Sequence, residues 1–299
     1  MVKKKSTKGS RNQHHSFLLD QFSNVDLINW KKLSDSVQEY EVRAYYELEA
    51  QRTLHYDALT QSLNNSQCIS PYRKSSLTRI VDYKYSLSPL SVKGSMIMGG
   101  RFNIGEKSED LGLKAFPVLY MADGFETAYS ERFGNRSNGL EAHELSLTKP
   151  SSFTSVNVSV NLDTVFDLTK PKNLKEFVRL ISQFTVSSDL VNLGIKIGHK
   201  GKIMIADPID LQRSLIEENW RHRPSQFAIP ANSQIFGKIL KDAGFQGILF
   251  PSSKLSRKEC LGVFVENIEG TDSYVKIENM PPEGVESELN SKNWRNFTI

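Results

Sequence analysis

Two short segments near the middle of the chain carry residue types that suit chemistry on an anionic substrate. The first, Gly99–Asn103, reads Gly-Gly-Arg-Phe-Asn. Its glycines let the backbone approach a ligand closely, and its guanidinium and amide suit a phosphate group. The second begins with an apolar strand that ends at Tyr120 and continues into a helix that carries Glu126 and Glu131. This order predicts a tyrosine and a carboxylate beside one another.

An arginine upstream and a serine downstream extend this set of residues. Arg79 lies on a predicted strand, on the same face as two apolar residues, where a guanidinium requires an anionic partner. Arg73 is a competing candidate, and an arginine that reaches solvent from the end of the strand is the alternative. Ser252 follows the buried strand Gly247–Phe250, and Ser253 comes directly after it, so either hydroxyl can face the site.

These motifs resemble the RES domain in residue type and in order along the chain. They are Arg79, the segment Gly99–Asn103, Tyr120 with Glu131, and a later succession of Trp220, Gln234-x-x-Gly237 and Gly247–Ser252. The domain is named for its arginine, glutamate and serine, and RES proteins are the toxins of bacterial RES–Xre toxin–antitoxin pairs. The resemblance covers about residues 72–270. Phe102 stands where the family usually has tryptophan, which keeps an aromatic ring.

The resemblance implies that the substrate is NAD+ and that its nicotinamide–ribose bond is cleaved. It assigns catalytic roles to Glu131, Arg79 and Ser252, and binding roles to Arg101, Tyr120, Asn103 and Gly100. Cleavage of this bond builds positive charge on the ribose, which a nearby carboxylate stabilises more in the transition state than in the ground state. The two arginines suit the pyrophosphate, because a planar fork matches it better than lysine does. The tyrosine offers a flat face to the nicotinamide and a hydroxyl to the ribose.

The acceptor of the ADP-ribose stays open between inorganic phosphate, water and a protein side chain. An enzyme that uses phosphate or water depletes NAD+ and arrests growth, whereas one that uses a side chain is a protein ADP-ribosyltransferase. A catalytically silent binding protein of the same fold is the third hypothesis. The family also implies a helical Xre-type antitoxin as a partner that blocks the cleft. No cofactor is expected besides NAD+, which is the substrate.

Composition limits the remaining possibilities. Cys68 and Cys260 lie far apart without metal-ligand spacing, so we expect no zinc site and a reducing cytoplasm. The net charge of +4 is exceeded by the basic residues of the first 11 positions, so a general nucleic-acid surface is not implied. We expect no membrane span either, because no apolar run approaches about 18 residues.

The elements that must position these residues point to an α+β fold. We expect an ADP-ribosyltransferase-like twisted β core with flanking helices, and strands at 116–120, 153–160, 164–169, 247–250 and 261–266. The predicted organisation is a disordered basic tail (1–16), a helical extension (17–71), the RES domain (72–270) and a C-terminal tail (271–299). Within the extension, Val37–Leu59 has the period of an amphipathic helix or helical pair. Its apolar stripe packs on the core or receives a partner.

Overall fold

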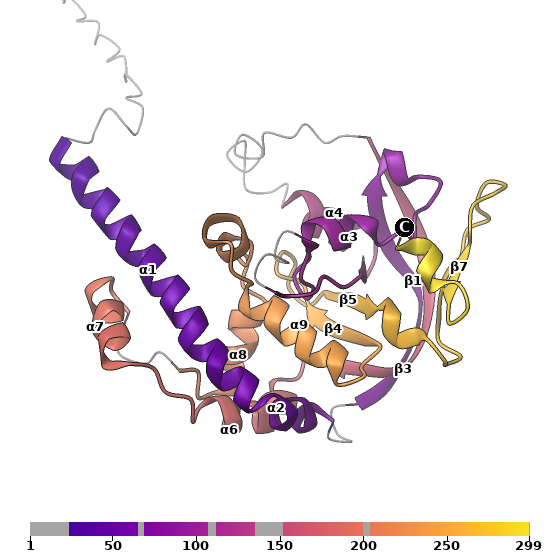
Figure 1. The fold of residues 1–299 in the computed structure, drawn as a ribbon. Helices are drawn as coiled ribbons and strands as arrows, with labels where there is room; N and C mark the ends of the chain where they lie inside the picture. Colours follow the sequence, from indigo (N-terminus) through magenta and orange to yellow (C-terminus); the bar gives the residue numbers. More distant parts are fainter. Residues whose placement is uncertain (1–23, 65–68, 107–111, 135–151, 200–203, 299) are drawn as a thin grey trace, which may run out of the picture.

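The computed structural model describes residues 24–64, 69–106, 112–134, 152–199 and 204–298 (Figure 1). The predicted basic tail, residues 1–16, lies outside these ranges. Helices cover one face of a curved sheet, and one long helix projects from the body of the molecule (Figure 1). The expected α+β class, with flanking helices and an N-terminal helical extension, is confirmed.

The sheet has seven strands in the order β1-β2-β5-β4-β3-β6-β7. They are β1 (Ile69–Asp82), β2 (Val118–Ala122), β3 (Phe153–Asp167), β4 (Gly247–Pro251), β5 (Glu259–Phe264), β6 (Tyr274–Ile277) and β7 (Glu288–Asn290). Within the described residues, β3 and β4 pair in parallel, and the other strand pairs of this sheet are antiparallel. Strand β1 pairs with β3 as well as with β2, so β1, β2, β5, β4 and β3 form a closed ring. The two segments 153–160 and 164–169, expected as separate strands, are largely one continuous strand.

The helical elements lie mainly on one side of this ring. The α-helices are α1 (Asn24–Leu54), α2 (Tyr56–Leu63), α3 (Lys93–Met98), α4 (Phe125–Phe133), α6 (Lys175–Ile181), α7 (Ser188–Lys196), α8 (Pro208–Leu215) and α9 (Asn232–Asp242). Shorter turns are η2 (Tyr83–Tyr85), η5 (Pro171–Leu174), η6 (Arg223–Phe227), η7 (Val265–Ile268) and η8 (Trp294–Phe297). None of the helices in these described ranges is long and apolar enough to cross a membrane.

Two apolar cores occupy the two faces of the sheet. The first packs α2, α6, α8 and α9 against strand residues such as Val118, Phe166 and Ile248. The second lies on the opposite face and includes Leu77 and Leu119. Residues after 270, expected to form a tail, add β6 and β7 to the edge of the sheet and contribute to the second core. Neighbouring residues on one strand therefore belong to different cores, as the period of two requires.

The helical pair expected at 37–59 is present as α1 and α2. Tyr40 and Ala44, on the C-terminal half of α1, are buried against Leu190 of α7. The carboxylate of Glu47 on this half accepts hydrogen bonds from the backbone and hydroxyl of Ser187. This part of the stripe therefore packs against α7, whereas the N-terminal half exposes Val25, Ile28, Trp30 and Leu33.

Candidate functional site

The carboxylate of Glu131 is the centre of the candidate site. It projects from α4, which follows β2, and it meets the loop Ser252–Lys258 that joins β4 to β5. The register pairs the end of β2 with the start of β5, so the helix and this loop arise at the same end of the sheet. Glu131 and Ser252, which lie 121 positions apart in the sequence, are thereby brought into contact.

One oxygen of Glu131 is saturated by donors from this loop. Oε1 accepts hydrogen bonds from the Ser252 hydroxyl at 2.5 Å, the Ser253 amide at 2.8 Å and the Lys254 amide at 3.3 Å. The Ser252 hydroxyl is itself fixed by the Lys254 and Leu255 amides, at 3.2 and 3.0 Å. Oε2 receives only a long contact of 3.4 Å from the Ser253 hydroxyl within the described residues. The carboxylate is therefore fixed mainly through one oxygen, and the other oxygen is held only weakly by the described residues.

Arg101 reaches the same loop from the Gly-Gly-Arg-Phe-Asn segment. Its guanidinium donates to the Ser253 hydroxyl at 3.0 Å and to the Glu217 carbonyl at 2.6 Å. Burial holds the pKa of Arg101 below its usual value, and the nearby Glu131 carboxylate opposes this effect in part. Ser253 links the arginine to the carboxylate, because its hydroxyl contacts both. Both serines that the sequence left as alternatives thus face Glu131.

The remaining groups of the Gly-Gly-Arg-Phe-Asn loop are occupied by one another. The Tyr120 hydroxyl donates to Asn103 Oδ1 and accepts from the Phe102 amide, both at 2.9 Å. The Asn103 amide donates to the Ser95 and Phe116 carbonyls at 2.8 and 3.0 Å. Of the residues that the resemblance places at the dinucleotide, Tyr120, Asn103 and Gly100 therefore lie together as a scaffold, and Arg101 alone extends to Glu131.

Two glycines of this region have no space for a side chain. A Cβ on Gly100 would lie 2.5 Å from both the Tyr120 ring and Asn103 Oδ1. A Cβ on Gly237 of α9 would lie 2.0 Å from the Phe102 carbonyl oxygen. Gln234, one turn earlier on α9, donates to the Gly100 and Asn103 carbonyls at 3.1 and 3.0 Å. The Gln-x-x-Gly motif thus holds the loop that carries Arg101.

Arg79 lies apart from this cluster. Its side chain shares a face of β1 with Leu77, which belongs to the second core, whereas Tyr120 packs against the first core. The hydrogen bonds that the structure gives Arg79 go to the carbonyls of Pro89, Ser91 and Tyr120, at 2.7, 2.6 and 2.9 Å. Burial lowers the pKa of its guanidinium to about 10, so it stays charged at neutral pH. The structure does not bring Arg79 to Glu131.

Arg73, the alternative to Arg79, also lies away from Glu131. It donates to Asn161 Oδ1 at 2.7 Å across the β1–β3 pair and is exposed. Trp220 is a site residue to which the sequence analysis gave no role. Its ring lies 5.9 Å from the Arg101 guanidinium and 4.3 Å from that of Arg221. A tryptophan next to an arginine in a polar loop is the sequence signal that marks it.

Removal of the Tyr120 hydroxyl tests whether this group supports the fold or binds a substrate. The substitution Tyr120→Phe leaves Asn103 Oδ1 and the Phe102 amide without a buried partner, so we expect a loss of about 1–3 kcal/mol of unfolding free energy. Urea denaturation measures this loss, with the exposed Tyr83→Phe as the control. Unchanged stability together with weaker NAD+ binding would instead indicate that the Tyr120 hydroxyl binds the ribose, a role that its residue type also suits.

Comparison with known proteins gives one family and a distant structure. A family model described as the RES domain matches residues 76–281, which is more than half of the chain. Among solved structures, the chain is similar to one in the crystal structure of the M. tuberculosis MbcT–MbcA toxin–antitoxin complex. The sequence identity is 15%, the coverage is 80% of this chain and 96% of that chain, and the TM-score is 0.44. A search of curated proteins finds no match.

Proposed function

The chain belongs to the RES domain family, and we propose that it is a toxin that binds NAD+ and cleaves its nicotinamide–ribose bond. The observation that carries this proposal is the fixed carboxylate of Glu131. Its Oε1 is held by the loop after β4, and its Oε2 stays beside the Ser253 hydroxyl that Arg101 also contacts. A carboxylate fixed in advance stabilises positive charge without reorganisation when that charge appears.

In the proposed reaction, the bond between the ribose carbon and the nicotinamide nitrogen breaks. The electron pair moves to the nitrogen, so neutral nicotinamide leaves and the ribose acquires the character of an oxocarbenium ion. The negative charge of Glu131 stabilises this ion. An oxygen of inorganic phosphate or of water then bonds to the ribose carbon, giving ADP-ribose phosphate, or ADP-ribose and a proton. Ser252 is proposed as the residue that orients Glu131, and Arg101 as the pyrophosphate ligand.

Arg79 enters this proposal as a positioning residue. Its three hydrogen bonds to carbonyl oxygens tie the segment with Pro89 and Ser91 to the backbone of β2 at Tyr120. The Tyr120 ring lies against the Gly100 backbone, so the position of β2 determines the position of the loop that carries Arg101. Arg79 therefore acts on the site through the backbone.

Product analysis tests the reaction directly. Purified chain is incubated with NAD+, with and without phosphate, and the products are identified by mass. We expect nicotinamide in both cases, with ADP-ribose phosphate formed only when phosphate is present if phosphate is the acceptor. A gain in the mass of a protein added as acceptor, equal to that of ADP-ribose, would favour protein ADP-ribosylation. NAD+ that remains intact in both reactions contradicts the proposal and favours the silent binding protein.

Expression in bacteria tests the role as a toxin. We expect the wild-type chain alone to arrest growth and deplete NAD+, and Glu131→Gln to do neither. A helical antitoxin, which we propose as the partner, is expected to restore growth by direct binding when a neighbouring gene that encodes it is co-expressed. Normal growth with unchanged NAD+ on wild-type expression would contradict the proposed toxicity.

A further inference from the structure

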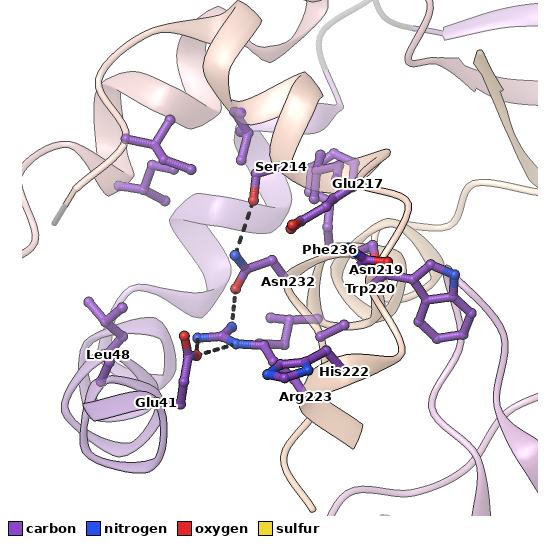
Figure 2. A pocket seen from close by; sticks show the side chains of 18 of the residues that line it. Glu41, Leu48, Ser214, Glu217, Asn219, Trp220, His222, Arg223, Asn232 and Phe236 are labelled. Atoms are coloured by element: carbon purple, nitrogen blue, oxygen red, sulfur yellow. Dashed lines mark hydrogen bonds and ion pairs between the residues drawn. The ribbon is translucent and has the colours of Figure 1, made fainter. Parts of the chain in front are cut away.

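A large cavity lies beside the Glu131 site, and none of the residues that the sequence predicted for the site is among those that line this cavity. It has a volume of about 880 Å³ and lies between α1 and the segment that joins α8 to α9 (Figure 2). Cavities of this size are typical of sites for small molecules. The wall includes residues of α1, such as Glu41 and Leu48, which lie outside the segment 76–281 that matches the RES family model.

The cavity wall touches the candidate site at three places. The Glu217 carbonyl accepts a hydrogen bond from Arg101, and the Glu218 carboxylate pairs with the ammonium of Lys254. The Trp220 ring lies 5.9 Å from the Arg101 guanidinium. Glu217, Glu218 and Trp220 all line the cavity. A ligand that is held by Arg101 can therefore continue past Trp220 into the cavity.

The lining suits an uncharged aromatic ring with polar edges. Much of it is apolar or aromatic, including Leu48, Phe177, Phe184, Leu215 and Phe236. The charged lining residues balance in number, since the three arginines Arg52, Arg221 and Arg223 are matched by the three glutamates Glu41, Glu217 and Glu218. A balanced charge does not favour a polyanion, and a large apolar surface with few polar groups favours a heterocycle.

Two polar features also belong to this wall. Arg223 binds the Glu41 carboxylate of α1 at 2.6 Å and the Asn232 side chain of α9 at 2.6 Å, and Asn232 donates to the Ser214 hydroxyl at 3.1 Å (Figure 2). This chain of contacts ties α1 to the core across the cavity. Ser233, also in the wall and 1% exposed, has a hydroxyl that no group of the described residues satisfies. A buried hydroxyl without a partner favours a ligand that brings a donor or an acceptor.

We propose that this cavity holds the adenosine half of NAD+, with α1 as its outer wall. The inference rests on the proposed function, in which the scissile bond lies at Glu131 and the pyrophosphate at Arg101. The adenosine then continues from Arg101 past Trp220, and adenine, an uncharged heterocycle with polar edges, fits the lining. The N-terminal extension is thereby part of the binding site of this chain.

A truncated substrate separates this role from catalysis. Nicotinamide mononucleotide has the same scissile bond as NAD+ but lacks the adenylate half. Leu48→Trp places a larger ring in the cavity from α1, and Leu33→Trp places the same ring on the exposed half of that helix. We expect the ratio of kcat/KM for NAD+ to that for the mononucleotide to fall at least tenfold in Leu48→Trp and to be unchanged in Leu33→Trp. A parallel fall for both substrates, or no fall, would overturn the proposal.

Direct binding of AMP separates a failure of this proposal from a failure of the proposed function. In calorimetric titrations we expect AMP to bind wild-type and Glu131→Gln chains equally and Leu48→Trp at least tenfold more weakly, with thermal unfolding as the check on folding. If the wild-type chain cleaves neither substrate but shows this pattern of AMP binding, the proposed enzymatic function is wrong and the assignment of the cavity to adenosine stands. If the wild-type chain cleaves NAD+ but Leu48→Trp binds AMP as tightly as wild type does, the proposed enzymatic function stands and the assignment of the cavity to adenosine is wrong.

Discussion

Replacement of Glu131 by glutamine is expected to lower the turnover of NAD+ by about a hundredfold or more and to change its affinity by only a few-fold. Glutamine keeps the shape of the side chain, and its carbonyl oxygen can still accept from the Ser252 hydroxyl and the Ser253 amide. What is lost is the negative charge. That charge acts mainly where positive charge develops on the ribose, so the loss falls on the chemical step rather than on binding.

Single-turnover measurements with saturating NAD+ give the rate of this step, and titration gives the affinity. Glu126→Gln is the matched control, because Glu126 lies on the same helix but is exposed. We expect it to retain wild-type turnover. Full activity in Glu131→Gln would remove the carboxylate from the mechanism. A large loss of affinity at unchanged turnover would make it a binding residue instead.

Replacement of Arg101 by lysine is expected to weaken NAD+ binding by about 10- to 100-fold, the range for loss of hydrogen bonds between charged groups. A lysine ammonium cannot donate in the planar pattern with which Arg101 now reaches the Ser253 hydroxyl and the Glu217 carbonyl. The measurement is a calorimetric titration of NAD+ into chains that also carry Glu131→Gln, so that no substrate is consumed.

Arg79→Lys provides the comparison for this result. Arg79 donates to three backbone carbonyls, and lysine cannot reach all three, so we expect this variant to lower the unfolding temperature as well as the affinity. Arg101→Lys is expected to act on affinity far more than on unfolding. Unchanged affinity in both variants would place the pyrophosphate elsewhere. A loss of affinity in Arg79→Lys alone, at unchanged stability, would favour direct contact between Arg79 and the substrate.

The local part of the candidate site was readable from the sequence because its motifs are local. Tyr120 and Glu131 are connected by a short turn between β2 and α4, so their spacing determines their separation. The strand before Ser252 is short, largely buried and ended by proline, which predicts that the serine lies at the end of this strand. That the segment with Glu131 meets the segment that ends at Ser252 was expected from the family resemblance and not from a local sequence pattern.

The sequence could not reveal where each polar group finds its partner. The position of Arg79 on a strand face was readable, but which core that face meets depends on the closure of the sheet through β1 and β3. The Tyr120 hydroxyl suits a ribose by type, yet in the fold it bonds Asn103 and the Phe102 amide. Strands β6 and β7 have only four and three residues, too few for alternation to mark them.

The contact between Glu131 and the loop after β4 also determines when the candidate site can form during synthesis of the chain. The carboxylate leaves the ribosome 121 residues before the serine that fixes it. At about 5–20 residues per second, this interval lasts roughly 6 to 24 s. Strand β1 must likewise wait for β3 to be made before the ring of strands can close. A growing chain therefore cannot form the contact between Glu131 and Ser252, or close the ring of strands, until most of it has been translated.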